Sequence, residues 1–175
     1  MRAIPLTVTA LAAAVLLTGC GSDGGSDSAD KKNHDDTACR LGGVSVQVGP
    51  ANAAPAAGDT GDVPVTISNR GAECTLEGFP GVTLSAGGAS ATVSAQQAGT
   101  PQKLTLAKDG TASFTLTYVR GAEGDAKSLG ATKLRLALPG ATDSKSFPWS
   151  YGPVRGKKDA HDPEASVTAF QQAGD

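Results

Sequence analysis

The sequence contains few of the residues that usually carry enzyme or metal chemistry. Its 175 residues include only two histidines, three cysteines, one tryptophan and one methionine. Both histidines, His34 and His161, lie in polar segments, so they offer no catalytic triad with a serine or a cysteine. The single methionine is Met1, and the histidines are far apart in sequence, which argues against a copper carrier that uses soft ligands.

Further absences narrow the classes of partner. The aromatic fraction is 4%, too small for a broad platform on which sugars stack. The 15 basic residues are balanced by 17 acidic ones, so the chain lacks the positive field of a nucleic-acid-binding protein. Four carboxylates, Glu73, Glu77, Glu123 and Asp125, could meet as a glycosidase-like pair, but their spacing favours solvated side chains. Because no glycine-rich phosphate loop is present either, we expect neither enzymatic activity nor a bound cofactor or metal.

What the sequence does contain begins with an apolar N-terminus. Residues 3–17 form an apolar run that follows Arg2 and is shorter than the roughly 20 residues of a bilayer-spanning helix. The run ends at Leu17-Thr18-Gly19-Cys20, which resembles a bacterial lipobox. The resemblance implies that residues 1–19 are a lipoprotein signal peptide, removed after diacylglycerol is transferred to the sulfur of Cys20. The alternative is an ordinary signal peptide with a chance cysteine near its end.

Lipidation of Cys20 predicts a location at the extracytoplasmic face of the cell membrane. Each buried methylene contributes about 0.8 kcal/mol, so two or three acyl chains, such as palmitate, hold a protein stably. After Cys20, residues 21–38 contain no Val, Ile, Leu, Met or aromatic residue, which predicts a disordered polar tether with a span of roughly 20–25 Å. No second apolar run of about 18 residues follows. We therefore expect membrane contact through the lipid on Cys20, with residues 20–38 as anchor and tether.

The remaining residues, 39–175, have the length of one domain and the pattern of short β-strands. Apolar residues alternate in 44–48 and 63–67, and turn residues separate the candidate strands. Further candidate strands are 82–85, 91–94, 103–107, 112–119, 133–138, 146–151 and 166–170. Only residues 120–131 have the composition for a helical turn. About eight or nine short strands without crossover helices predict an all-β fold, an antiparallel two-sheet sandwich that is immunoglobulin-like.

The candidate core consists of the inward-facing residues of these strands. They are Val46, Val65, Ile67, Leu76, Val82, Leu84, Leu104, Leu106, Phe114, Leu116, Leu134, Leu136, Leu138 and Trp149. Alternation places Phe147, Trp149 and Tyr151 on one face, where a core role is favoured over a shelf for a ligand. Trp149 follows all three cysteines, so the strict immunoglobulin order of Cys, Trp and Cys is not present.

Three cysteines in an exported chain leave an odd one. If Cys20 carries lipid, Cys39 and Cys74 are left as one pair, and an extracytoplasmic compartment allows them to form a disulfide. This disulfide would close a loop of about 36 residues and stabilise the domain by roughly 3–4 kcal/mol. Free thiols or a redox pair are the alternative, although no Cys-x-x-Cys spacing favours a lowered thiol pKa.

The residues around Cys74 are the most distinctive part of the chain. Residues 69–82, NRGAECTLEGFPGV, combine an Asn-x-Gly turn, a cysteine and a Leu-x-Gly-Phe-Pro-Gly-Val run. This segment resembles the signature of an uncharacterised family of exported proteins and lipoproteins, the domain of unknown function 4232. The resemblance runs from Cys39 to Phe170. It implies a β-sandwich at the cell envelope and carries no established activity.

The same segment also has a structural interpretation. Gly71 and Gly78 can supply positive φ angles, Pro80-Gly81 fits a type II turn, and Phe79 can close one end of the sandwich. A structural role is therefore favoured, and a binding edge built on Phe79 and Pro80 is the alternative. Trp149 and Tyr151 are the other candidate binding residues.

The sequence thus predicts a cell-envelope lipoprotein that acts as a non-enzymatic binding or structural module outside the cytoplasmic membrane. Its expected partner is an envelope protein or a cell-wall component, and not nucleic acid. The basic cluster of Arg155, Lys157 and Lys158 is a candidate contact for anionic lipid or wall polymer. The alternatives are an extracytoplasmic carrier of a small ligand and an enzyme with an unrecognised site.

Overall fold

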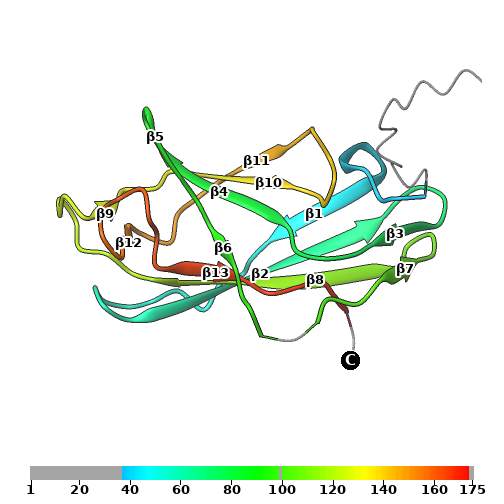
Figure 1. Cartoon of the computed structure of the whole chain (residues 1–175), viewed down its shortest axis with the longest axis horizontal. Coiled ribbons are helices and arrows are strands. Elements are labelled where there is room, and N and C mark those ends of the chain that lie inside the picture. Colours follow the sequence, from blue (N-terminus) through cyan, green and yellow to red (C-terminus); the bar gives the residue numbers. More distant parts are fainter. Residues whose placement is uncertain (1–36, 99, 174–175) are drawn as a thin grey trace, which may run out of the picture. The chain divides into compact units, whose positions relative to one another are not determined.

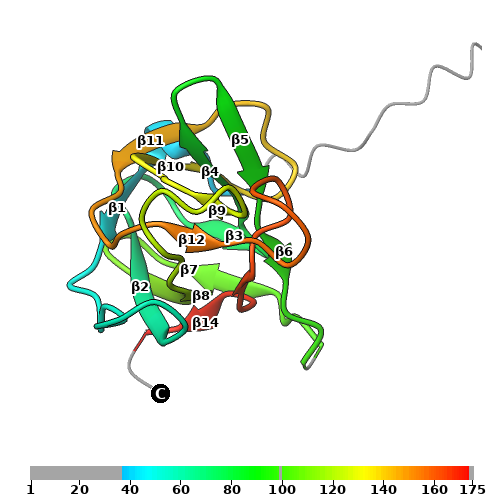
Figure 2. The same cartoon turned by 90° about the vertical axis from the view of Figure 1, so that its left-hand side faces the viewer.

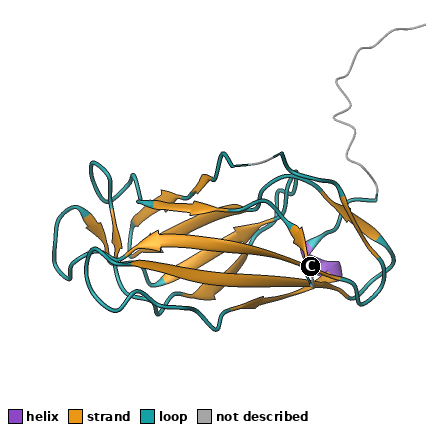
Figure 3. Ribbon diagram, turned by 90° about the horizontal axis from the view of Figure 1, so that it is seen from below, coloured by secondary structure: helices purple, strands orange, loops and turns teal. Residues whose placement is uncertain are grey.

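The computed structural model describes residues 37–98 and 100–173, and strands and loops make up nearly all of this part of the chain (Figure 3). These residues belong to one compact unit. The expected signal peptide, Cys20 and most of the expected tether lie outside the described residues. In the described part, one 3₁₀ turn, η1 (Leu41–Gly43), precedes the first strand.

The described strands are short, and most follow an alternation of buried and exposed residues. They are β1 (Val44–Val48), β2 (Thr60–Asn69), β3 (Cys74–Leu76), β4 (Gly81–Ala86), β5 (Ala89–Thr92), β6 (Ser94–Ala95), β7 (Leu104–Leu106), β8 (Thr111–Val119), β9 (Ser128–Leu129), β10 (Lys133–Ala137), β11 (Lys145–Pro148), β12 (Val154–Arg155), β13 (Ala165–Val167) and β14 (Gln171–Gln172).

The larger sheet is built around the long antiparallel pair β2 and β8. Its order is β1-β2-β8-β13-β6 (Figure 1), and β14 also pairs with β8. The β2–β8 register runs from Thr60 opposite Val119 to Ser68 opposite Thr111. Alternate residues of both strands are buried, so one face of this sheet is directed into the core.

A second sheet of order β11-β10-β4-β5 supplies the other main part of the core. Leu134 and Leu136 of β10 lie opposite Leu84 and Val82 of β4, and all four side chains are buried. Two small ribbons, β12–β9 and β3–β7, complete the arrangement (Figure 2). Side chains from both larger sheets belong to one hydrophobic core, which confirms an all-β fold of packed sheets.

The pairing differs from the expected antiparallel pattern at one edge. β6 pairs with β13 in parallel, with Ser94 opposite Ser166.

Residues 120–131 form turns and β9, so the helical turn expected there is wrong. The three glycines of this segment are the physical reason, because glycine weakens a helix by about 1 kcal/mol per residue. The immunoglobulin-like arrangement of the sheets stays a prediction.

The predicted core is confirmed at most positions. Val46 and Leu104 are only partly buried, since each lies on a strand at the margin of its sheet or ribbon. The sequence prediction missed Tyr118, which is fully buried on β8. Tyrosine is usually intermediate in burial, so the residue type did not indicate that Tyr118 belongs to the core.

The turn predicted at Pro80-Gly81 is wrong. A type II turn there would place Gly81 at positive φ, but Gly81 opens β4 and lies opposite Ala137. Gly78 has a φ of 96°, so the positive φ expected at that position is confirmed, whereas Gly71 is not among the positive-φ residues of the described chain. The reversal therefore occurs at Gly78, before the proline.

Candidate binding site

The disulfide expected from the sequence joins Cys39 to Cys74, with a Cα–Cα distance of 4.9 Å. Backbone hydrogen bonds fix the same segments: Cys39 N–H donates to the carbonyl of Thr75 at 2.9 Å, and Thr75 N–H donates to that of Thr37 at 2.8 Å. The chain therefore enters the domain along β3, and the disulfide holds the entry point covalently.

Asn69 organises the turns beside this disulfide. Among the polar and charged residues of the described chain, Asn69 is the one that is buried, at 1% exposure. The Nδ2 group donates to the carbonyls of Ala72 at 2.7 Å, Leu106 at 2.9 Å and Ala107 at 3.2 Å. Oδ1 accepts from the N–H of Gly71 at 3.0 Å. The Asn-x-Gly motif is thus a structural device that joins the turn after β2 to the turn after β7.

Trp149 and Tyr151, two of the expected binding residues, belong to an aromatic cluster with a structural role. Trp149 is 5% exposed and packs edge-on against Tyr118 at 5.1 Å and Tyr151 at 4.9 Å between ring centroids. Trp149 Nε1 donates to the carbonyl of Gly152 at 2.7 Å, and the Tyr118 hydroxyl donates to that of Tyr151 at 2.8 Å. A buried indole with its N–H already bonded offers no face to a ligand, so Trp149 is a core residue.

The other expected binding residues, Phe79 and Pro80, lie between β3 and β4. Phe79 is half-buried and Pro80 is buried. The preceding Gly78 accepts a hydrogen bond at its carbonyl from the N–H of Phe170, at 3.3 Å. This contact brings the distinctive segment beside the C-terminal strands.

The basic cluster expected to meet lipid or wall polymer is compensated by carboxylates. Arg155 Nε contacts Glu164 Oε2 at 2.7 Å, and Lys157 Nζ lies 3.9 Å from Asp162. The hydrogen bond from Arg155 lowers the pKa of Glu164, and it raises the pKa of Arg155. The loop therefore presents neighbouring charges of both signs and not a positive surface.

The four carboxylates considered as a glycosidase-like set are divided between two places. Glu73 and Glu77 flank β3, whereas Glu123 and Asp125 lie between β8 and β9. Figure 1 shows β3 and β9 at opposite ends of the sheets. A glycosidase needs its two carboxyl groups within about 10 Å, so the first pair does not meet the second.

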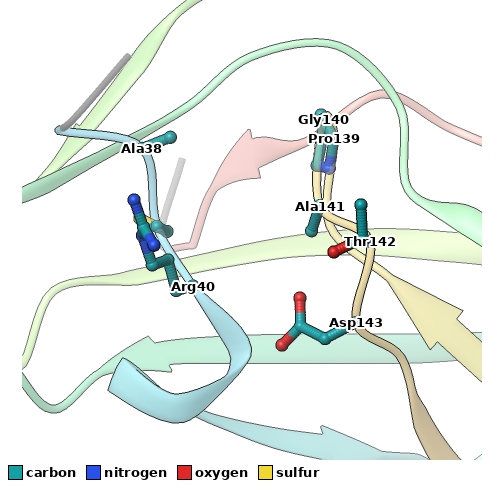
Figure 4. A pocket seen from close by; sticks show the side chains of 8 residues that line it. Ala38, Arg40, Pro139, Gly140, Ala141, Thr142 and Asp143 are labelled. Atoms are coloured by element: carbon teal, nitrogen blue, oxygen red, sulfur yellow. The ribbon is translucent and has the colours of Figure 1, made fainter. Parts of the chain in front are cut away.

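A shallow pocket of about 100 Å³ lies beside the disulfide. Arg40 and Ala38 form one wall, and the loop of residues 139–143 after β10 forms the other (Figure 4). The carboxylate of Asp143 points into the space between the walls. Because this volume falls below the roughly 300 Å³ of ordinary ligand sites, it holds at most a few atoms.

A larger groove, of about 600 Å³, lies between the described residues that lead from β6 into β7, 96–98 and 100–104, and the C-terminal segment of residues 168–172. In Figure 1 the first segment is green and the second is red. We call this hollow the glutamine groove. Its described lining residues are Gln96, Ala98, Thr100, Gln102, Leu104, Thr168, Ala169, Phe170, Gln171 and Gln172.

The chemistry of the glutamine groove is polar and uncharged. Four glutamine amides and two threonine hydroxyls supply donors and acceptors. Phe170 is 3% exposed and packs edge-on against Phe114 at 5.6 Å, so it forms the floor and leaves little ring surface free. None of the described lining residues ionises near neutral pH, which suits recognition by hydrogen bonds more than proton transfer.

Sequence reasoning missed the glutamine groove because its two walls lie about 70 residues apart in the chain. The local signal was a Gln-Gln pair that follows a strand in each wall, Gln96-Gln97 and Gln171-Gln172, and such pairs have no distinctive spacing. Once β13 and β6 are paired, the walls come together, and that parallel pairing was not predicted.

The fold places the described residues among all-β domains of packed sheets. Residues 39–171 match the family described as "Domain of unknown function (DUF4232)", and the chain belongs to this family. The resemblance drawn from residues 69–82 is thereby confirmed. No curated protein and no solved structure matches the chain.

Among residues 37–98 and 100–173, no helix has the length and apolar character needed to cross a membrane. In the same part of the chain, no group of three or more His, Cys, Asp or Glu residues is arranged to hold a metal ion.

Proposed function

We propose that this protein is a non-enzymatic binding module, tethered by lipid on Cys20 to the extracytoplasmic face of the cell membrane. The observation that carries the binding role is the glutamine groove, whose uncharged amides and hydroxyls can position a ligand by hydrogen bonds. The anchoring role is supported by the lipobox-like tetrapeptide of residues 17–20 and by the polar composition of residues 21–38. The partner is an envelope protein or a cell-wall component.

The location of the groove fits this proposal. Leu104 lines the groove and also pairs with Leu76 of β3, the strand that carries Cys74. The groove is therefore near the point where the chain enters the domain. A tether of about 18 residues confines such a site close to the membrane and raises its effective concentration toward partners at the same surface.

A carrier of a small ligand is the second candidate function. The volume of the groove, about 600 Å³, lies within the roughly 300–1,000 Å³ of small-molecule sites. The two functions differ in what the groove retains after purification, because a carrier releases a small molecule on denaturation and a module for macromolecules does not.

Crosslinking in intact cells tests the binding role. A photoreactive amino acid replaces Gln102, which lines the groove, or Ser90 on β5, which serves as the matched control. We expect a discrete adduct from position 102, absent from position 90, and lost when Gln171→Lys places a charge in the groove. No adduct at 102, or an equal pattern at both positions, would contradict a binding role for the groove.

A further inference from the structure

The glutamine groove lies beside an incomplete edge of the larger sheet. β14 is hydrogen-bonded to β8, and β6 covers the same edge only beside β13. Just after β6, Gln96 N–H donates a hydrogen bond to the carbonyl of Val167 on this edge, at 2.8 Å. Beyond Gln96 the chain leaves the sheet and becomes the opposite wall of the groove.

The register shows which backbone groups of β14 turn toward the groove. Gln171 lies opposite Ser113 and Gln172 lies opposite Ala112. Ala173 N–H donates to the carbonyl of Thr111 at 3.2 Å. In an antiparallel pair, alternate residues direct their backbone groups toward the partner strand. Gln172 therefore directs its N–H and C=O away from β8 and toward the groove that it lines.

We propose that the glutamine groove binds an extended, uncharged polypeptide segment, which adds to the larger sheet as a strand along β14. A backbone donor and acceptor on one residue, here Gln172, match the spacing of a polypeptide strand. Side chains of the described groove lining carry no charge, so a segment rich in Ser, Thr, Gln and Gly loses less solvation there than a charged one. This inference rests on the binding function proposed above and names its partner class.

Two other occupants fit the groove less well. A glycan is usually held by exposed aromatic rings, and Phe170, the aromatic residue of the described lining, is 3% exposed. The chain's own residues 21–36 include Asp and Lys side chains, which the uncharged walls do not complement. An uncharged peptide brings no charged group into the groove, so it does not need an oppositely charged side chain in the walls.

The test uses the full-length protein in detergent micelles and two blocked peptides of sequence Gly-Thr-Gln-Thr-Ser-Thr-Gly. One peptide has a normal backbone, and the other is N-methylated at alternate residues, which removes backbone donors but keeps the side chains. NMR titration follows the backbone amide of Gln172. We expect the normal peptide to shift this amide and the N-methylated peptide to bind at least about tenfold more weakly, a difference of about 1.4 kcal/mol.

Two substitutions at one position separate backbone from side chain. Gln172→Pro removes the N–H that faces the groove, and Gln172→Ala keeps it. We expect Gln172→Pro to lower peptide affinity by about tenfold and Gln172→Ala to change it little. A thermal unfolding curve for each variant shows whether the fold is retained; should Gln172→Pro not fold, the comparison of the two peptides on the natural chain decides.

The outcomes distinguish this inference from the broader proposal. Equal binding of both peptides, or binding that leaves the Gln172 amide unshifted, would overturn the added strand. If a neutral oligosaccharide of N-acetylglucosamine shifts groove residues and the peptide does not, the peptide partner is wrong while a binding function stands. The absence of groove adducts in the crosslinking experiment would instead remove the binding function itself.

Discussion

At the scale of single residues, Asn69 shows how a polar group is accommodated in an apolar core. Its amide reaches three carbonyls and one N–H that belong to two turns. The buried group is the amide itself, at 1% exposure, and without these partners it would cost about 1–3 kcal/mol. Asparagine is suited to the position because it donates and accepts from one planar group.

Asn69→Asp should therefore destabilise the domain strongly although it preserves side-chain shape. The substitution replaces the amide donors with a carboxylate oxygen that faces carbonyl oxygens. We expect the free energy of unfolding in denaturant to fall by about 2–4 kcal/mol. Gln47→Glu, an amide-to-carboxylate change at an exposed position opposite the uncharged Thr66, is the control and should change it by less than about 0.5 kcal/mol. Equal effects at both positions would contradict the assigned role of Asn69.

The pair of Arg155 and Glu164 gives a prediction about protonation. The hydrogen bond from Arg155 lowers the pKa of Glu164. A depressed carboxyl pKa means that the pair contributes stability above the carboxyl's unfolded pKa of about 4.3, and that this contribution is lost as pH falls through the folded pKa. Both side chains are partly exposed, so solvent screening keeps the effect small.

Arg155→Met should raise the pKa of Glu164 toward its ordinary range, since the hydrogen bond and the nearby positive charge are both removed. The measurement is an NMR titration of the Glu164 carboxyl carbon. Lys158→Met is the control, because Lys158 is not among the groups that shift this pKa. A Glu164 titration that is the same in the natural protein and in Arg155→Met would disprove the contact in solution.

At the scale of elements, the Cys39–Cys74 disulfide fixes the short strand β3 to the entry of the chain. β3 has three residues and pairs with the equally short β7. A two-stranded ribbon of this length is marginal by itself. The disulfide, whose cysteines are separated by 35 positions, restricts the unfolded chain and so favours the folded ribbon.

Replacing both cysteines with alanine should lower the free energy of unfolding by about 3–4 kcal/mol, as the loop-entropy estimate gives for this separation. Denaturant unfolding with and without reductant measures the effect. The natural protein should lose a similar amount in reductant, while the double variant should be insensitive to it. Insensitivity of the natural protein to reductant would show that the disulfide does not stabilise the domain.

The accuracy of the sequence analysis differs between kinds of element. Strands with clear alternation, such as β1, β2 and β8, were predicted because their inward residues had to be apolar. β9, β12 and β14 have only two residues each, too few to show a period. β14 pairs with the long β8, and β9 and β12 pair with each other although they lie far apart in sequence, which is information that no local window contains.

The candidate site was less predictable than the fold. The sequence offered Trp149 as a binding candidate through its cluster with Phe147 and Tyr151 but favoured a core role, and its indole N–H is indeed satisfied by Gly152 inside the core. The glutamine groove arises from the register of β14 on β8 and from the departure of the chain at Gln96. Both are tertiary properties, so common residues such as glutamine gave no advance indication.

At the scale of the whole molecule, the proposed anchor makes a prediction about location. Cys20→Ser removes the sulfur that would accept lipid. We expect the variant to be recovered without acyl chains and to accumulate with residues 1–19 still attached, because lipidation precedes cleavage in lipobox-containing precursors. Mass spectrometry of the membrane and soluble fractions measures both properties. Ser22→Ala is a nearby control that should leave them unchanged. Normal processing of Cys20→Ser would refute the lipid anchor.

The position of β8 has a consequence for the order in which the domain is made. β8 pairs on one side with β2, from the first third of the described chain, and on the other with β13 and β14, near its end. Val167 and Phe170 of this last part are buried in the core. Contacts so distant in sequence slow folding, because the closure of long loops precedes any gain from them. A nascent chain therefore has an incomplete core until its final strands are synthesised, and a chain cut after β12 would leave one whole side of β8 without a partner.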